Sequence, residues 1–306
     1  MSHKQKSAPR IGLALGSGSS RGWAHIGVIK ALSELDIHPE VVCGCSIGSI
    51  VAAAYVSGNL DKLEQWVRSL TKVELARYIE LNLSLNGFVD TEKLHEFFLQ
   101  CVCREDESIE DITVKFASVA TDLETGREVW FTSGPLIDAV WASISLPGLF
   151  PPLQHQGRWL VDGGLVNPVP VSVCHALGAD IVISVNLNGG VVGKHFVQKQ
   201  NEPSTDSNNV LDRLSRAVNK YSPDIFSDDD DKTSSPGLLD AIAGSINIAQ
   251  DRITRSRLAG DPPDIMLSPK LSHIGLMEFY RAREAIHEGE QCVMRMLPEI
   301  RHVLGK

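Results

Sequence analysis

Long apolar runs are missing from this sequence of 306 residues, as is any excess of positive charge. No stretch of about 18 uninterrupted apolar residues occurs, so we expect no membrane-spanning helix. Residues Met1–Arg10 are polar and lack the apolar centre of a secretory signal, so we predict a cytoplasmic protein. The formal net charge of −9 predicts an acidic surface that repels polyanions. We therefore expect no nucleic-acid partner, while a local basic patch would still allow a peripheral membrane contact.

Cysteine is also scarce, and its spacing argues against two common uses. The six cysteines are Cys43, Cys45, Cys101, Cys103, Cys174 and Cys292. They are too few for the disulfide framework of a small secreted domain, and a cytoplasmic protein keeps its thiols reduced. The two Cys-x-Cys pairs lack the spacing of a common zinc site and have no histidine pair nearby. We expect buried thiols, no metal site and no cofactor.

The remaining composition is that of an ordinary folded protein, with 43% hydrophobic and 22% charged residues. Near the amino terminus the same pattern occurs twice. Ile11–Leu15 is a short apolar run followed by a glycine-rich turn and by helical spacing over residues 23–35. Val41–Cys43 is again followed by glycines and by a helical pattern over 50–56. Two successive strand–turn–helix units predict an α/β fold with a mostly parallel sheet covered by helices.

Further strands and helices follow, and one polar segment interrupts them. We predict strands over 114–121, 128–131, 159–161, 179–187 and 264–267, and helices over 136–144, 242–258 and 277–303. Ser, Asn, Asp and Gln dominate residues 189–236, which predicts a mobile surface insertion, with a lid or a partner-contact segment as the alternative. We thus expect a flexible N-terminus at 1–9, a domain at 10–188, that insertion, and a segment at 237–306 that completes the same domain.

The strongest local signal is the pentapeptide Gly44-Cys45-Ser46-Ile47-Gly48, a G-x-S-x-G motif between a predicted strand and a predicted helix. A sharp turn in that position forces the serine into strained geometry and exposes its hydroxyl, and the flanking glycines make room for crossing segments. The positive end of the following helix points at the serine and at any oxyanion formed there. We predict that Ser46 is a nucleophile; a tight structural turn is the alternative.

A serine nucleophile needs a base, and Asp162 is the candidate that stands out. It ends the predicted strand 159–161 and is followed by Gly163 and Gly164, which suit a close turn. An aspartate at the carboxyl edge of a parallel sheet would share that edge with Ser46. The alternatives are an Asp162 that only caps its turn, and a Ser-His-Asp triad of the α/β-hydrolase type. The downstream histidines, none in an evident catalytic setting, are His95, His155, His175, His195, His273, His287 and His302.

The third element is the loop Gly16-Ser17-Gly18-Ser19-Ser20-Arg21-Gly22, between the first strand and the first helix. Successive amides at a helix start attract anions, so a phosphate cradle is one interpretation. The loop lacks the GK[ST] ending of a P-loop, however, and its third glycine is displaced from the dinucleotide-binding pattern. An oxyanion hole fits better, with the amides of Gly18 and Ser19 assisted by the Arg21 cation.

These three elements, in this order, resemble the patatin-like phospholipase family over Ile11–Val171. The segment Leu258–Asp264 is similar to the bacterial RssA-type members, which are related to the neuropathy-target-esterase group. The resemblance implies a three-layer α/β/α fold and hydrolysis of lipid acyl esters, phospholipid or lysophospholipid, through an acyl-enzyme and a histidine-free Ser–Asp dyad. It makes Ser46 the nucleophile and Asp162 the proton acceptor. The implied oxyanion residues are Gly16, Gly18, Ser19, Arg21 and Gly22, and the supporting glycines are Gly44, Gly48, Gly163 and Gly164.

One position departs from the family pattern, because the family often carries glycine where Ser19 stands. A side chain there would crowd the oxyanion pocket or restrict the backbone. This departure and the insertion at 189–236 motivate an alternative, a regulatory or adaptor protein that keeps the fold and binds a protein partner. The sequence leaves the oligomeric state and the lipid head group open.

Overall fold

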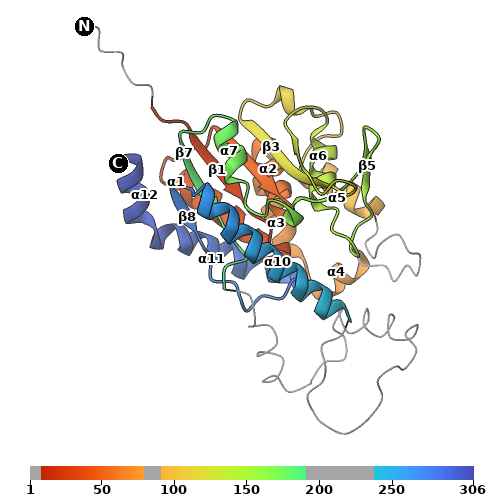
Figure 1. Cartoon of the computed structure of the whole chain (residues 1–306). Coiled ribbons are helices and arrows are strands. Elements are labelled where there is room, and N and C mark those ends of the chain that lie inside the picture. Colours follow the sequence, from red (N-terminus) through yellow and green to blue (C-terminus); the bar gives the residue numbers. More distant parts are fainter. Residues whose placement is uncertain (1–7, 79–90, 191–237) are drawn as a thin grey trace, which may run out of the picture.

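The structure is a computed structural model that describes residues 8–78, 91–190 and 238–306 (Figure 1). The predicted flexible N-terminus at 1–9 and the predicted mobile insertion at 189–236 lie outside the described residues, apart from positions 8, 9, 189 and 190. Both therefore stay predictions.

Eight strands of the described segments form a single sheet in the order β5-β6-β3-β2-β1-β7-β8, with β4 beside β3. Their bounds are Ile11–Leu15 (β1), Val41–Cys45 (β2), Lys115–Asp122 (β3), Glu128–Phe131 (β4), Leu153–His155 (β5), Arg158–Asp162 (β6), Ile181–Val185 (β7) and Ile265–Leu267 (β8). The five strands from β3 through β2, β1 and β7 to β8 are parallel, while β4 and β6 run antiparallel to β3. The predicted mostly parallel sheet is confirmed.

Helices cover both faces of this sheet (Figure 1). They are Ala24–Glu34 (α1), Ile47–Val56 (α2), Leu60–Ser69 (α3), Lys72–Tyr78 (α4), Thr91–Cys101 (α5), Leu136–Ile144 (α6), Val171–Ala176 (α7), Leu238–Gly260 (α10), Ala282–Arg295 (α11) and Leu297–Leu304 (α12). Short 3-10 turns are Ser19–Trp23 (η1), Ile109–Asp111 (η2), Gly163–Leu165 (η3) and Phe279–Arg281 (η4). Two hydrophobic cores lie between the sheet and these helices. The larger core lies under α1, α2, α6 and α11, and the smaller one lies under α7 and the end of α10. The implied three-layer α/β/α fold is therefore confirmed.

The segment after residue 237 adds to the same sheet and to the same core. Its strand β8 pairs with β7, and its helix α11 packs on α1 so closely that no side chain fits at the crossing. A Cβ at Gly27 would lie 1.9 Å from the carbonyl oxygen of Ile286, and one at Gly289 would lie 2.1 Å from that of Ala24. The two helix backbones therefore touch.

One predicted helix was wrong in detail, and one strand was not predicted. The single C-terminal helix predicted over 277–303 is instead the turn η4 followed by α11 and α12. Pro298 stands in the first turn of α12, and a proline there has no amide to donate to a preceding turn, so the chain starts a new helix. The short strand β5 was missed, because three residues carry too little periodicity to be recognised.

Candidate active site

Ser46 and Asp162 are brought together along one side of β3. Strand β2 pairs with residues 115–119 of β3, and β6 pairs with residues 120–122. Strand β4 pairs with residues 118–121, which overlap both of these ranges, so it occupies the opposite side of β3. Strands β2 and β6 therefore lie end to end on the same side of β3. Strands β2 and β6 run in opposite directions, and their carboxyl ends meet. This geometry corrects the expectation that Asp162 ends a parallel strand: β6 is antiparallel, and its end reaches Ser46 because it runs towards β2.

Ser46 stands in a strained turn between β2 and α2. Its φ of 54° and ψ of −125° lie where residues with a side chain are rarely found. A Cβ at Gly44 would lie 2.5 Å from the Cα of Ser49, and one at Gly48 would lie 2.2 Å from the carbonyl oxygen of Leu15. Only glycine fits at these two positions, so Gly44 lets the start of α2 approach β2 and Gly48 lets it approach the end of β1.

The hydroxyl of Ser46 donates a hydrogen bond directly to the carboxylate of Asp162. Oγ of Ser46 lies 2.5 Å from Oδ2, and the amide of Gly164 donates to Oδ1 at 2.6 Å. Asp162 is only 1% exposed. Burial raises its pKa to about 6, although both hydrogen bonds oppose the rise. At neutral pH this carboxyl group is ionised, and it is a stronger base than a carboxylate in water.

The two glycines after Asp162 are required by contacts on both sides. A Cβ at Gly163 would lie 2.1 Å from the carbonyl oxygen of Val119 on β3. A Cβ at Gly164 would lie 2.4 Å from Nε2 of Gln250 and 2.9 Å from Oδ1 of Asp162 itself. The Asp-Gly-Gly sequence therefore lets β3 and α10 approach the carboxylate closely.

Two backbone amides of the glycine-rich loop, those of Gly18 and Ser19, have no hydrogen-bond acceptor among the described residues. The neighbouring amides donate to carbonyls of other segments: Gly16 to Val185, Ser17 to Pro168 and Ser20 to Leu276. These bonds fix the loop at the carboxyl ends of β1 and β7. The amides left free are the two that the sequence assigned to an oxyanion hole.

Arg21 lies behind this loop, with none of its side chain exposed. Its guanidinium donates to the carbonyl oxygen of Gly18 at 3.2 Å, to that of Leu187 at 3.4 Å and to Oδ1 of Asn247 at 3.2 Å. Burial lowers the pKa of Arg21 to about 10, so the group keeps its charge at neutral pH. These contacts hold the loop from the interior, and a direct contact between Arg21 and an oxyanion stays a prediction.

Ser19 adopts a φ of 52°, the left-handed region that favours glycine. Its Oγ donates to the carbonyl oxygen of Leu276 at 2.6 Å, and this bond fixes the orientation of its hydroxyl. Ser19, which stands where the family often has glycine, therefore has a strained backbone and a hydrogen bond to the segment before η4.

The patatin-like phospholipase family model matches residues 13–175, which is more than half of the chain. The chain belongs to this family. An uncharacterised NTE family protein of Mycobacterium tuberculosis is 32% identical over 337 residues, covering 95% of this chain and 92% of that protein. Human patatin-like phospholipase domain-containing protein 6 is 32% identical over 188 residues, or 58% of this chain and 13% of its own length. Lysophospholipase NTE1 of Pyricularia oryzae is 28% identical over 299 residues, or 95% of this chain and 18% of its own.

As a member of the patatin-like phospholipase family, the chain is an enzyme that hydrolyses carboxylic esters of lipids. In the segments that the structure describes, no helix has both the length and the apolar character to span a membrane. A cytoplasmic location stays a prediction.

No histidine of the described segments hydrogen-bonds to Ser46 or Asp162 in this patatin-like phospholipase. His195 lies outside those segments. His25, which precedes the serine and lies buried in α1, was not among the predicted site residues. Its Nε2 lies 2.7 Å from the carbonyl oxygen of Gly16, and burial lowers its pKa to about 4. A neutral His25 therefore supports the glycine-rich loop.

Three further polar side chains at the site were also missed. Oγ of Ser143, at the end of α6, accepts a hydrogen bond from the amide of Ser46 at 2.9 Å. Gln250 and Asn247 reach the glycine-rich loop from α10. No local motif marks these residues, because each acts through a contact between segments that are far apart in the sequence.

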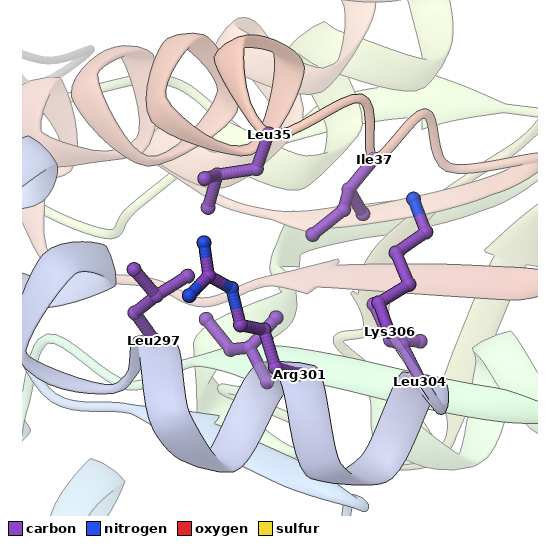
Figure 2. A pocket seen from close by; sticks show the side chains of 7 residues that line it. Leu35, Ile37, Leu297, Arg301, Leu304 and Lys306 are labelled. Atoms are coloured by element: carbon purple, nitrogen blue, oxygen red, sulfur yellow. The ribbon is translucent and has the colours of Figure 1, made fainter.

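A separate cavity of about 220 Å³ lies away from Ser46 and Asp162 (Figure 2). It is lined by Leu35, Ile37, Leu297, Ile300, Arg301, Leu304 and Lys306. Residues 35–37 precede β2, whereas Ser46 follows it, so the cavity and Ser46 lie at opposite ends of that strand. All six cysteines are buried and unpaired, and the described residues contain no cluster of three metal-ligating side chains.

Proposed function

We propose that this patatin-like phospholipase cleaves an acyl ester of a phospholipid or lysophospholipid through a covalent acyl-enzyme on Ser46. The direct hydrogen bond of 2.5 Å between Oγ of Ser46 and Oδ2 of Asp162 carries the proposal. The name of the Pyricularia relative, a lysophospholipase, supports this substrate class.

In the first step Asp162 accepts the hydroxyl proton while Oγ of Ser46 attacks the ester carbonyl. The carbonyl oxygen becomes an oxyanion, and the free amides of Gly18 and Ser19 donate to it. Losing one such donor costs about 3 kcal/mol of transition-state stabilisation. The amino end of α2, which begins at Ile47, adds a favourable field at the same place.

In the second step the tetrahedral adduct collapses and its bond to the alcohol oxygen breaks. Protonated Asp162 returns the proton to that oxygen, so the glycerol portion of the lipid leaves as an alcohol with its phosphate head group attached, and the acyl group stays on Ser46. Water then gives a proton to Asp162 and attacks the acyl carbonyl. A second collapse releases the carboxylic acid and restores the hydroxyl of Ser46. A pKa of about 6 suits Asp162 to both directions of proton transfer near neutral pH.

A fluorophosphonate probe tests the nucleophile without knowledge of the substrate. We expect covalent labelling of the wild type at Ser46, no labelling of Ser46→Ala, and normal labelling of Ser69→Ala, whose serine is exposed on α3. Peptide mass mapping locates the adduct. Labelling of a folded Ser46→Ala variant at another residue, or none in the wild type, would refute the proposed mechanism.

Substrate class is tested by matched lipids. Wild type and Ser46→Ala are incubated with a lysophospholipid, a diacyl phospholipid and a triacylglycerol of the same acyl chain, and the released fatty acid is measured. We expect release from one of the two phospholipid classes in the wild type alone. Release from triacylglycerol only would contradict the phospholipid assignment while leaving the nucleophile intact.

The triad alternative has its own test. Single replacement of His195 or of any described histidine except the buried His25 is expected to leave the labelling rate within a few-fold of the wild type. A fall of about 10³-fold at one of these positions would identify a histidine base and reject the dyad.

A further inference from the structure

Helix α10 turns a polar face towards the catalytic site. Asn247, Gln250, Asp251 and Thr254 are all buried. The positions 247, 250, 254 and 257 are spaced so that they follow one side of a helix. A helix face buried against a core is ordinarily apolar, so a buried polar stripe needs an explanation at its contacts.

The carbonyl end of Gln250 holds the glycine-rich loop. Its Oε1 accepts from Oγ of Ser17 at 3.2 Å and from Nδ2 of Asn188 at 3.3 Å. Asn188 also donates to Oγ of Ser17 at 3.0 Å, which closes a three-membered network. Ser17 directly precedes the free amides of Gly18 and Ser19. Displacing the carbonyl of Gln250 would therefore disturb the oxyanion donors.

The amide end of Gln250 faces the turn that carries the catalytic base. Nε2 of Gln250 and Oδ1 of Asp162 lie 2.4 Å and 2.9 Å from the same point, the place where a Cβ of Gly164 would be. A neutral donor thus stands beside the buried carboxylate. One side chain touches both halves of the site, the loop through Oε1 and the Asp-Gly-Gly turn through Nε2.

We infer that Gln250 is a positioning residue that fixes the oxyanion loop and Asp162 relative to each other. This inference rests on the proposed function of the dyad. Because its carboxamide is neutral, Gln250 connects the two halves without adding charge beside the base.

The carboxylates whose side chains the structure describes on β4 and on α10 are each paired with an arginine. Glu128 of β4 lies 2.6 Å from Arg257 of α10, and Asp251 lies 2.9 Å from Arg255. The thiol of Cys45 on β2 is neutral, because burial and the nearby Asp162 raise its pKa well above its usual range. A carboxylate placed at position 250 would therefore be an unpaired negative charge next to Asp162.

Gln250→Glu tests the inference through the pH dependence of fluorophosphonate labelling. A like charge beside a buried acid favours its protonated form, so we expect the acid limb of the labelling rate to move up by about one pH unit. Gln291→Glu, an exposed position on α11, makes the same change of net charge and is expected to leave the limb in place. A folded Gln250→Glu variant with the wild-type limb would overturn the inference.

Gln250→Met removes both polar ends at nearly constant volume and covers the case in which the glutamate variant does not fold. We expect its labelling rate at pH 8 to fall at least tenfold, with the acid limb unmoved. A folded Gln250→Met variant that labels at the wild-type rate would overturn this inference but leave the proposed dyad intact. A wild type that does not label at all would instead refute the dyad, and the inference with it.

Discussion

The turns that carry Ser46 and Asp162 each contain an unfavourable feature, and the two features differ in kind. Ser46 has an unfavourable backbone, with a φ of 54°. Asp162 has an ordinary extended backbone, with a φ of −48° and a ψ of 131°. Its penalty is electrostatic, because an ionised carboxylate is buried with two hydrogen bonds and no cation bonded to it among the described residues.

Each penalty also contributes to the proposed chemistry. The strained turn exposes Oγ of Ser46 at the start of α2, and the buried site raises the basicity of Asp162. The surroundings enforce both, through the contacts at Gly44 and Gly48 and through the packing of β3 and α10 around the Asp-Gly-Gly turn. Conformational strain does not depend on pH, whereas the penalty of a buried charge does. The two can therefore be separated by experiment.

The largest expected effect is the loss of activity in Asp162→Asn. Asparagine can keep the bond from the amide of Gly164 but cannot accept a proton, so we expect kcat/KM for an activated ester to fall by about 10³-fold or more. Steady-state kinetics on the folded variant measures this. Retention of a tenth of the activity would show that another base serves Ser46, and His195 would be examined first.

The same substitution is expected to stabilise the fold, in a pH-dependent way. The folded pKa of Asp162 lies near 6, above the ordinary 3.8, so ionisation opposes folding. This destabilisation is full above pH 6, shrinks as the pH falls through 6 and is absent below about 4. Two pKa units correspond to about 3 kcal/mol. The free energy of unfolding of Asp162→Asn should therefore exceed that of the wild type by about that amount at pH 8 and by about half of it at pH 5.

Urea unfolding at pH 8, 6.5 and 5 measures this difference. Asp106→Asn, at an acid whose side chain is 88% exposed, is the matched control and should show no such trend. A stability difference between wild type and Asp162→Asn that stays constant across these pH values would contradict the buried-charge interpretation.

The activity of the wild type should depend on the same ionisation of Asp162. Because only ionised Asp162 accepts a proton, kcat/KM is expected to fall about tenfold per pH unit below pH 6. Assays from pH 5 to 8 with a substrate that does not ionise in this range measure the limb. A midpoint below pH 5 would mean that Asp162 is not the buried base.

Structural features that depend on residues close together in the sequence could be predicted. A short apolar run, glycines and helical spacing around Ser46 were enough for the turn, and the strand before Asp162 was found within a residue. The bridging role of β3 was not predictable, because the direction of β6 is decided by pairing with residues 40 positions earlier. The expectation that Asp162 lies at the same edge as Ser46 was useful, although its assumption of a parallel strand was wrong.

The polar face of α10 was hidden for a related reason. Asn247 and Gln250 look like solvent-exposed residues on a helix until their contacts with Arg21 and Ser17 are known. His25 and Ser143 were hidden in the same way, by contacts with the backbone of Gly16 and Ser46. Sequence patterns report which residues lie on one face of an element, but not which segment that face meets.

The smallest expected effect isolates the strain at Ser46. Ser46→Ala and Ser46→Gly both lose the hydroxyl and its bond to Asp162, so their difference in stability excludes that loss. Alanine keeps the unfavourable φ, whereas glycine adopts it freely, and the greater entropy of unfolded glycine offsets part of the gain. We expect the glycine variant to be more stable by about 1 kcal/mol, equally at pH 8 and pH 5.

Gly44 and Gly48 hold this turn against β1 and α2, so the strain cannot relax in the alanine variant. Equal stabilities would place the penalty of this turn elsewhere, and a pH-dependent difference would mean that the two penalties are coupled through Asp162.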